Sequence, residues 1–223
     1  LARPLNFSPA MKTIIAIDGP AASGKSSVAR KLAKTIGFSY VNSGSFYRTA
    51  TWHMIAKGVD IQNPESVATA AGTADFFSGF ENGESFFEVG GQRANITDDA
   101  VNRGVSAVAR VPEVRAVVNA HLHALASVAD CIVEGRDIGS AVFPETPYKF
   151  YIDASPEVRQ QRRSAQGQAD EVAARDRQDS SRATAPLTIP EGSTVIDSTH
   201  LSIDQVVDAI VSALESRGLS PTP

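Results

Sequence analysis

The sequence predicts an α/β fold in which helices flank a parallel sheet. Three observations predict it. Strand-like apolar runs alternate with helix-like segments along the 223 residues, as expected of a parallel sheet. The first apolar run leads through a glycine-rich turn into a helical pattern. Residues 76–96 carry the turn signals of a hairpin instead, which indicates a small antiparallel insertion.

The first predicted strand and helix lie between residues 11 and 37. Residues 11–17 form an apolar run of the kind that becomes a buried strand. In residues 26–36 apolar side chains recur at helical spacing, and Gly37 supplies the residue type that commonly ends a helix. Further short strands, each followed by a turn and a helix, are expected at 40–41, 131–133, 148–152 and 194–196.

The starts of several later helices can be predicted from residue types that favour the first turn of a helix. Proline suits the first turn of a helix, and a serine followed three residues later by glutamine forms a capping box. These signals occur at Pro112, at Ser155-Pro156 and from Ser202 to Gln205. The last helix is expected to end at Gly218.

The insertion is predicted from its turns. Short aromatic and β-branched runs are separated by Gly79, by Glu81-Asn82-Gly83 and by Gly90-Gly91. Asn-Gly and Gly-Gly pairs suit the tight turns of hairpins. We therefore expect a small β-containing insertion over about residues 70–98.

The composition is that of a globular domain. With 42% hydrophobic and 21% charged residues, the chain resembles neither a disordered protein nor a fibre. The domain is expected to span residues 11–223, with residues 1–10 either a native extension or a remnant of an expression vector. Cys131 is the single cysteine and cannot form an internal disulfide, which fits a buried strand position and a reducing cytoplasm.

Two classes of partner are disfavoured. No apolar stretch approaches the roughly 20 residues that span a bilayer, so we expect no membrane partner. The net charge of −4 argues against a broad nucleic-acid surface. Arginines are nevertheless concentrated between residues 159 and 182, which suggests a localised anion site.

Residues 19–26 match G-x-x-x-x-G-K-[ST], a phosphate-binding loop. Its glycines let backbone N–H groups converge on phosphate oxygens at the positive end of the following helix. Lys25 would reach the β- and γ-phosphates, and the Ser26 hydroxyl would take one Mg²⁺ position. A chance glycine turn is the alternative, which the flanking strand and helix disfavour. The predicted nucleotide-binding residues are Gly19, Pro20, Ala21, Ala22, Ser23, Gly24, Lys25, Ser26 and Ser27.

Polar clusters follow two further predicted strands, where open α/β sheets bind their ligands. Ser43 offers a short hydroxyl, and Arg48 could bind a phosphate through its planar guanidinium, although a solvated helix arginine is the alternative. Neighbouring Tyr47 is interpreted as core packing. In the second cluster, Arg136 suits a substrate phosphate and Asp137 the hydrogen-bonding edge of a base. A charged turn with an internal ion pair is the alternative there.

An arginine-rich segment over about residues 155–186 is predicted to form a helical lid. Arg175, Asp179 and Arg182 are spaced so that they share one helix face. On an ordinary surface they would form an exposed ion-pair ladder. In an enzyme that transfers a phosphoryl group, negative charge spreads over the phosphoryl oxygens in the transition state. Arginines on this helix face would stabilise that transition state. The lid's other side could come from Arg159, Arg162 and Arg163.

With these motifs in place, the chain resembles bacterial-type cytidylate kinases, which transfer a phosphoryl group from ATP to CMP or dCMP. The resemblance covers nearly everything from Met11 to the last helix. It rests on I-D-G-P-x-x-x-G-K-S, S-G-x-x-Y-R, G-R-D-I-G-x-x-V-F-P, R-D-x-x-D-x-x-R-x-x-A-P-L and D-S-T-x-L-S-I-D-Q-V. It implies a nucleoside monophosphate kinase core, a P-loop kinase fold with the small antiparallel insertion and the lid.

The resemblance also implies roles for the site residues. ATP would bind the phosphate loop, with Mg²⁺ held by Ser26, ATP phosphates and water. Arg175 with Asp179 would meet the sugar or bridge the phosphates. The implied catalytic residues are Lys25, Arg136, Arg175 and Arg182. The implied CMP-binding residues are Ser43, Arg48, Ser106, Arg115, Arg136, Asp137, Asp179 and Arg182.

The chain departs from the family pattern at three positions. Asn42 stands where an acidic residue is common, Glu134 where a shorter aspartate is common, and Gln178 where arginine often occurs. The Glu134 carboxylate could still orient a water on Mg²⁺, whereas Asn42 has lost that option.

Two rival functions stay open on the sequence alone. Another small-acceptor kinase of the same fold, such as a thymidylate or shikimate kinase, would share the phosphate loop but use other acceptor contacts. The other rival function is a nucleotide-sensing switch. A GTPase switch should carry the guanine-binding motif N-K-x-D, and the nearest match, residues 95–98, lacks the lysine. We expect a cytoplasmic monomer that acts on small molecules.

Overall fold

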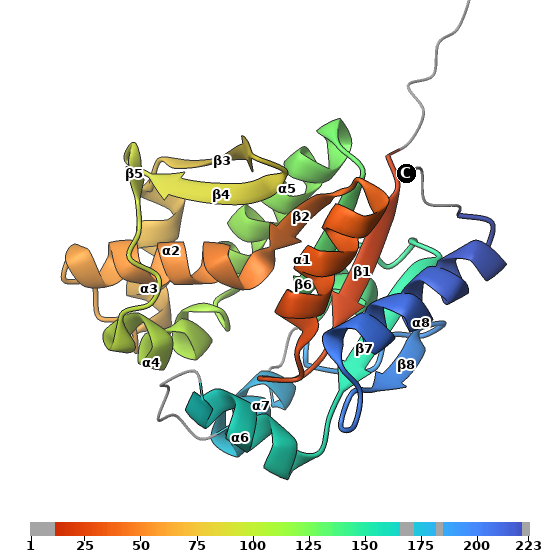
Figure 1. The fold of residues 1–223 in the computed structure, drawn as a ribbon. Helices are drawn as coiled ribbons and strands as arrows, with labels where there is room; N and C mark the ends of the chain where they lie inside the picture. The colour runs from red at the N-terminus through yellow and green to blue at the C-terminus, as the bar shows by residue number, and fades with distance from the viewer. Residues whose placement is uncertain (1–11, 166–171, 182–184, 220–223) are drawn as a thin grey trace, which may run out of the picture.

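The fold is described from a computed structural model, which covers residues 12–165, 172–181 and 185–219 (Figure 1). Its strands form one sheet in the order β3-β4-β2-β6-β1-β7-β8, with β5 beside β4. The strands are β1 (Ile14–Asp18), β2 (Ser39–Asn42), β3 (Phe76–Glu81), β4 (Glu84–Val89), β5 (Gln92–Arg93), β6 (Cys131–Gly135), β7 (Tyr148–Asp153) and β8 (Thr194–Asp197).

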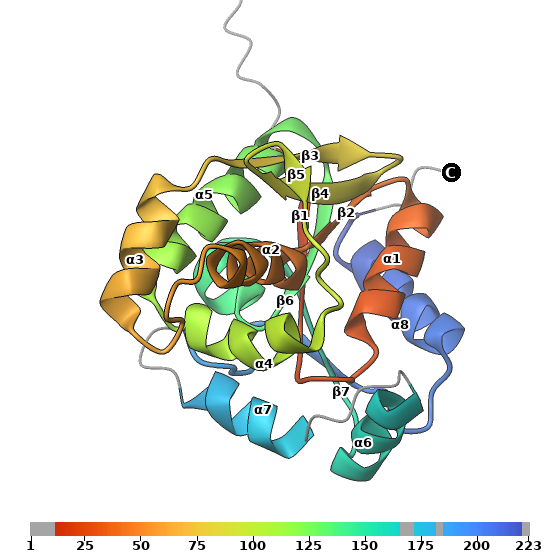
Figure 2. The ribbon, with the colours of Figure 1, turned by 90° about the vertical axis from the view of Figure 1, so that its left-hand side faces the viewer.

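Helices cover both faces of this sheet (Figure 2). In that view α1 and α8 lie on one side, and α2 to α5 lie on the other. The helices are α1 (Lys25–Ile36), α2 (Ser43–Ala56), α3 (Pro64–Thr73), α4 (Asp99–Val108), α5 (Pro112–Val128), the short π-helix η1 (Ile138–Val142), α6 (Pro156–Ala165), α7 (Val172–Ser180) and α8 (Ile203–Ser216).

The five central strands are all parallel, which confirms the predicted fold class. Every predicted strand is present at its place. Central strands of such a sheet are buried on both faces, and their continuous apolar runs supply two separate cores. One core packs α2 and α5 around Phe46 and Leu122. The other packs α1 and α8 around Leu32 and Ile210. Cys131 is buried in β6, as expected.

The predicted helix ends are present. Gly37 closes α1 in the left-handed conformation with φ of 73°, and Pro112 begins α5. At α8, Ser202 accepts from the Gln205 N–H while the Gln205 side chain accepts from the Ser202 N–H, so the capping box is complete. Gly218 is left-handed two residues after α8 ends.

The predicted hairpin forms, but it is continuous with the central sheet. Strands β3 and β4 pair antiparallel across the Asn82-Gly83 turn, and β5 adds two further residues. Strand β4 then lies parallel to β2, where Tyr40 pairs with Glu84. The antiparallel strands therefore extend one edge of the main sheet, above α2 in Figure 1. None of the helices in the described ranges has the length and apolar character that a membrane crossing requires.

Candidate active site

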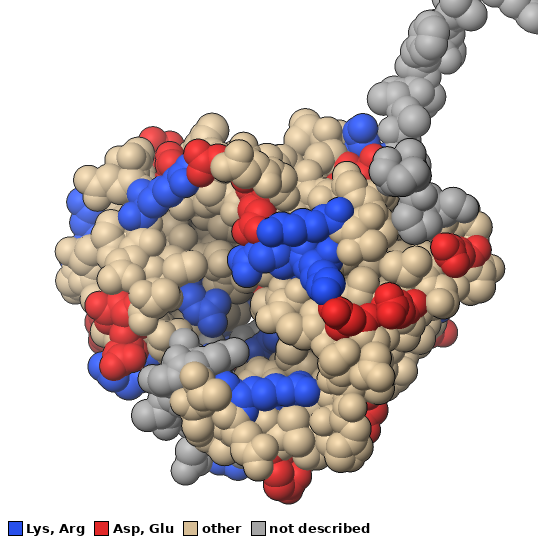
Figure 3. Space-filling model, in the orientation of Figure 1, with Lys and Arg blue, Asp and Glu red and all other residues tan. Residues whose placement is uncertain are grey.

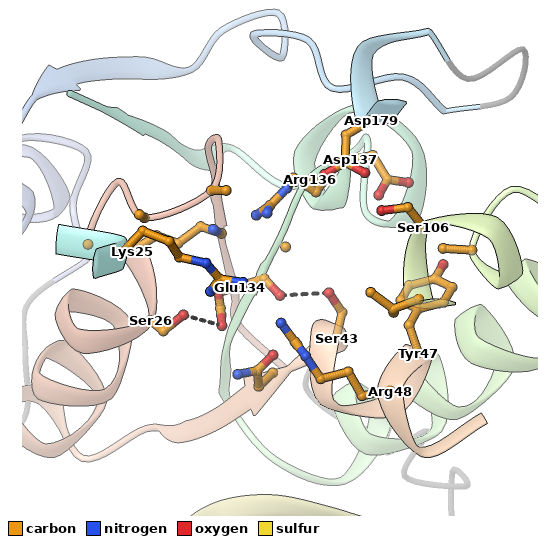
Figure 4. Close-up of a pocket in the computed structure, with 18 of the residues that line it drawn as sticks. Lys25, Ser26, Ser43, Tyr47, Arg48, Ser106, Glu134, Arg136, Asp137 and Asp179 are labelled. Atoms are coloured by element: carbon orange, nitrogen blue, oxygen red, sulfur yellow. Dashed lines mark hydrogen bonds and ion pairs between the residues drawn. The ribbon is translucent and has the colours of Figure 1, made fainter. Parts of the chain in front are cut away.

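A cavity of about 300 Å³ opens at the carboxyl ends of β1, β2 and β6. Figure 3 shows this face hollowed, with Lys and Arg side chains visible inside the hollow. The lining residues come from the phosphate loop, α2, α4, the turn after β6, α6 and α7, and Figure 4 shows most of them. The cavity therefore joins the predicted nucleotide loop to the predicted acceptor clusters.

The phosphate loop connects β1 to α1. Gly24 has φ of 93°, a left-handed conformation that places the loop's N–H groups ahead of the helix. Gly19 has φ of 154°, and a Cβ there would lie 2.1 Å from the Ile152 carbonyl oxygen. Both motif glycines are thus required by geometry. Lys25 is buried, and its Nζ donates to the Pro20 carbonyl oxygen at 3.0 Å.

Three arginines bind carbonyl groups of this loop. Arg136 Nη1 donates to the Gly19 carbonyl at 3.1 Å. Arg159 Nη1 donates to the Ala21 carbonyl at 3.3 Å, and Arg162 Nη1 donates to the Ser23 carbonyl at 3.2 Å. Arg159 and Arg162 therefore hold the phosphate loop, Arg159 also pairs with Asp176 of α7, and Arg163 lines the cavity. That these three arginines form the other side of a lid stays a prediction.

Ser26 and Glu134 place two hard oxygen atoms at the cavity wall. The Ser26 hydroxyl donates to Glu134 Oε1 at 2.8 Å, as Figure 4 shows. The Tyr40 hydroxyl donates to the same oxygen at 3.2 Å, so Glu134 is oriented from two sides. A hydroxyl and a carboxylate are ligands that Mg²⁺ accepts, and their chemistry fits the predicted metal position.

Asn42 has a structural task beside this pair. Its Oδ1 accepts from the Ser45 N–H and caps α2, while its Nδ2 donates to the Tyr40 hydroxyl at 3.1 Å. The side chain lines the cavity with its polar groups committed to the helix and to Tyr40. An aspartate would cap the helix equally well, so what asparagine adds here is the Nδ2 donor to the Tyr40 hydroxyl.

Asp137 lies in the cavity wall and pairs with Arg115 of α5. Both side chains are buried. Arg115 stands behind Asp137 and is not among the residues that line the cavity, although its Nη1 is buried without a hydrogen-bond partner among the described residues. Ser106 of α4 does line the cavity. These three residues, which only the family resemblance or the turn motif indicated, converge on one region.

Arg136 pairs with α7, one of the two helices in the predicted lid segment. Its Nε donates to Asp179 Oδ2 at 2.9 Å, and Asp179 is 3% exposed. The alternative of an exposed ladder is therefore wrong for Asp179. Since Asp137 pairs with α5 and Arg136 with α7, the alternative of an ion pair within the turn is not favoured either. Arg182 lies outside the described residues, the Arg175 side chain is not described, and Gln178 is exposed on α7.

The cluster at the start of α2 also faces the cavity. Ser43 is buried, and its hydroxyl donates to the Glu134 carbonyl at 2.8 Å. Arg48 extends into the cavity in Figure 4, and its Nε donates to Asn102 Oδ1 at 3.4 Å. The alternative of a solvated Arg48 is therefore not favoured. Tyr47, interpreted as core packing, is buried but also lines the cavity.

Sequence reasoning missed two carboxylates at the phosphate loop. Asp176 of α7 accepts from the Ala21 N–H at 3.1 Å and pairs with Arg159. Asp18, the last residue of β1, is fully buried and accepts from the Ile138 and Gly139 N–H groups. A charged residue that ends an apolar strand was the available signal for Asp18. Nothing local marks Asp176 beyond its place in an arginine-rich helix.

Burial raises the pKa of Asp18 from 3.8 to about 7. The two backbone N–H groups and the charge of Lys25 act in the opposite direction, whereas the charge of Asp137 raises the pKa further. The folded chain consequently binds a proton at Asp18 over a pH range in which the unfolded chain has lost it. This carboxylate favours folding at low pH, and that contribution is lost as the pH rises through about 7.

A comparison with Asp18→Asn isolates this effect. The free energy of unfolding of the parent, minus that of the variant, should fall by roughly 3 kcal/mol from about pH 5 to about pH 8. Urea denaturation at a series of pH values measures it, and titrating groups that do not interact with Asp18 cancel in the difference. A difference that is independent of pH would contradict the buried, titrating carboxylate.

A parallel sheet, a phosphate loop at the end of its central strand and a cavity with cationic walls define a P-loop protein that handles nucleotide phosphates. The family model for cytidylate kinase matches residues 15–216. The chain belongs to the cytidylate kinase family.

Individual relatives agree with this assignment. A cytidylate kinase of Streptomyces griseus is 39% identical over 215 residues, which cover 92% of this chain and 93% of that protein. A cytidylate kinase of Rhodococcus opacus is 39% identical over 218 residues, which cover 92% of this chain and 95% of that protein. Among solved structures, a shikimate kinase from Acinetobacter baumannii covers 94% of this chain and 96% of that one, at 14% identity and a TM-score of 0.49.

Proposed function

We propose that the protein transfers the γ-phosphoryl group of ATP to CMP or dCMP, giving ADP and CDP or dCDP. One observation carries the proposal: a single cavity is lined by the phosphate loop on one side and by Arg136, Asp137 and Ser106 on the other. Membership of the cytidylate kinase family supports the same acceptor. A thymidylate or shikimate kinase would need a different acceptor wall.

The phosphate loop is proposed to hold the donor. Backbone N–H groups ahead of α1 would bind the β-phosphate oxygens, with the positive end of the helix beneath them. Lys25 Nζ is 3.0 Å from the Pro20 carbonyl and would exchange this contact for β- and γ-phosphate oxygens. The bond from the bridging oxygen to the γ-phosphorus breaks, and ADP leaves.

Ser26 and Glu134 are proposed to hold Mg²⁺. When bound, the ion neutralises charge that collects on the phosphate oxygens during transfer. The Ser26 hydroxyl would bind it directly and the longer Glu134 side chain through water. The hydrogen bond from Tyr40 keeps the Glu134 carboxylate turned toward the cavity.

The base pocket is proposed to read cytosine by complementary hydrogen bonds. Cytosine presents an amino donor at N4 and acceptors at N3 and O2, whereas uracil presents an acceptor and a donor in the first two places. Asp137 and Ser106 would accept from the amino group. Ser43 already donates to the main chain, so its hydroxyl faces a ligand as an acceptor. Arg115 does not line the cavity, and it would act on the base through its ion pair with Asp137, whose carboxylate it orients.

The acceptor phosphate is proposed to lie among arginines. Arg48, Arg136 and Arg163 all line the cavity between the base pocket and the phosphate loop. Their charges would hold the phosphate of CMP in line with the γ-phosphorus of ATP. An oxygen of that phosphate is already anionic, so its attack needs no general base. Arg175 and Arg182 keep their proposed place as lid cations that close on the transferring group.

Asp137→Asn tests the base pocket. The amide keeps the size and one acceptor but loses the charge, so the KM for CMP should rise roughly tenfold or more. The KM for ATP should stay within about twofold, because the phosphate loop is untouched. Steady-state kinetics with each substrate varied in turn measures both. An equal rise in the two KM values would contradict the assignment of Asp137 to the base.

We also propose that the protein acts as a monomer in the cytoplasm, without a nucleic-acid partner. Residues of one chain line both the phosphate-loop side and the acceptor side of the cavity, so the proposed reaction needs no residue from a second chain. A single buried Cys131 suits a reducing compartment. Light scattering of the purified protein with and without substrates tests the oligomeric state.

A further inference from the structure

Asp18 is a buried carboxylate with no part in the proposed chemistry. It is the last residue of β1 and is fully buried. Its Oδ1 accepts from the Ile138 N–H and its Oδ2 from the Gly139 N–H, each at 2.7 Å. These two hydrogen bonds are called the Asp18 clasp below.

The clasp holds the beginning of η1. The first N–H groups of a helix have no acceptor within the helix itself. Asp137 precedes η1 but makes no side-chain capping bond to it, because its carboxylate faces Arg115. Asp18 therefore supplies both acceptors from a neighbouring strand, and the turn that carries Arg136 and Asp137 is fixed by β1.

The same bonds connect the donor and acceptor sides of the cavity. Asp18 directly precedes Gly19, the first glycine of the phosphate loop, and the Gly19 carbonyl accepts from Arg136 Nη1 at 3.1 Å. Ile138 and Gly139 directly follow Arg136 and Asp137, the two residues proposed to bind the acceptor. Three hydrogen bonds thus join the start of the phosphate loop to the acceptor-binding turn.

Space around the clasp is tight. A Cβ added at Gly139 would lie 3.3 Å from Asp18 Oδ2 and 3.2 Å from Pro190 Cγ. The turn therefore has little room to shift without displacing the carboxylate, and a shift of about 1 Å between two reacting groups can cost about a hundredfold in rate.

We propose that Asp18 is a positioning residue: its clasp sets where Arg136 and Asp137 stand relative to the phosphate loop, and so controls substrate alignment and the preference for cytosine over uracil. This inference rests on the proposed function. Lys25, Asp137 and Tyr151 are the titratable groups whose charges act on Asp18 or respond to it.

Asp18→Asn tests the clasp. The variant keeps the side-chain volume but turns an NH₂ group toward one of the two N–H groups, so the turn must shift. The kcat with CMP should fall roughly ten- to a hundredfold, while the KM for ATP changes by less than about twofold. The ratio of kcat/KM for CMP to that for UMP should fall roughly fivefold. This ratio does not depend on the fraction of folded enzyme, so mere destabilisation would not move it.

Thr146→Val is the matched control. The Thr146 hydroxyl donates to the Ile14 carbonyl at the opposite end of β1, so this variant also removes a side-chain bond to the strand. Its kcat and its CMP to UMP ratio should equal those of the parent. If Asp18→Asn does not fold, Gly139→Ala takes its place: the added Cβ would lie 3.3 Å from Asp18 Oδ2, which presses on the clasp, and the CMP to UMP ratio should fall in the same direction.

An unchanged CMP to UMP ratio in folded Asp18→Asn, or in Gly139→Ala where the first variant is insoluble, overturns the proposal. If the CMP to UMP ratio falls as much in Thr146→Val as in Asp18→Asn, the proposal is overturned too, because the loss of any side-chain hydrogen bond to β1 would then lower the ratio. No phosphorylation of CMP by the parent protein would overturn the proposed function, and this inference with it, before any variant is compared.

Discussion

Replacing Lys25 by methionine should lower the kcat for phosphoryl transfer by on the order of 10²–10³ with every acceptor. Lys25 is 7% exposed, and its ammonium group is the loop's cation nearest to where the β- and γ-phosphates would lie. Methionine has a side chain of similar length but no charge. The lysine charge stabilises the transition state more than the bound substrates, so its loss lowers kcat. Coupled ADP release at saturating CMP measures the loss.

Lys34→Met is the control for this variant. Lys34 lies in the last turn of the same helix, α1, and is exposed. Its replacement removes an equal charge from the same helix and should leave kcat within about twofold. Full activity in Lys25→Met would contradict the assignment of the phosphate loop, whatever the acceptor proves to be.

Glu134→Gln should lower kcat by roughly a hundredfold and raise the Mg²⁺ concentration needed for half-maximal activity. The amide can still accept from Ser26 and Tyr40, so the local structure should be kept. What it loses is the negative charge that would orient the hydrated ion. Titrating MgCl₂ at fixed ATP separates this effect from a loss of ATP binding.

Glu88→Gln serves as the comparison for that titration. Glu88 is paired with Arg93 on the β4–β5 hairpin, away from the cavity. We expect parental Mg²⁺ dependence there. If Glu134→Gln also keeps the parental Mg²⁺ dependence, the pair formed by Ser26 and Glu134 is not the metal position.

Local patterns in the sequence predicted most of the fold. The phosphate loop, the parallel strands and the caps at Gly37 and Ser202 each depend on a few adjacent residues whose chemistry favours one conformation. Helix α3 was missed although Asn63 and Pro64 form a recognisable start, with the Asn63 side chain accepting from the Glu65 N–H. Residues 63 and 64 therefore carry a local signal for the start of this helix.

Contacts between distant segments could not be predicted in this way. Arg136 meets Gly19 across 117 residues and Asp179 across 43. Asp18 bonds to Ile138 across 120 residues, and in the sequence it is simply a charge at the end of an apolar run. The topology of the sheet brings these segments together, since β1 lies directly between β6 and β7. Family resemblance indicated Ser106 and Arg115, for which no local pattern exists.

The most direct test is coupled ADP release with ATP and Mg²⁺ and a panel of acceptors: CMP, dCMP, UMP, dTMP, AMP and shikimate. The base pocket formed around Asp137 and Arg115 predicts rapid turnover with CMP and dCMP and much slower turnover with the other four. Faster turnover with any of those four, or none with all six, would contradict the proposed cytidylate kinase activity.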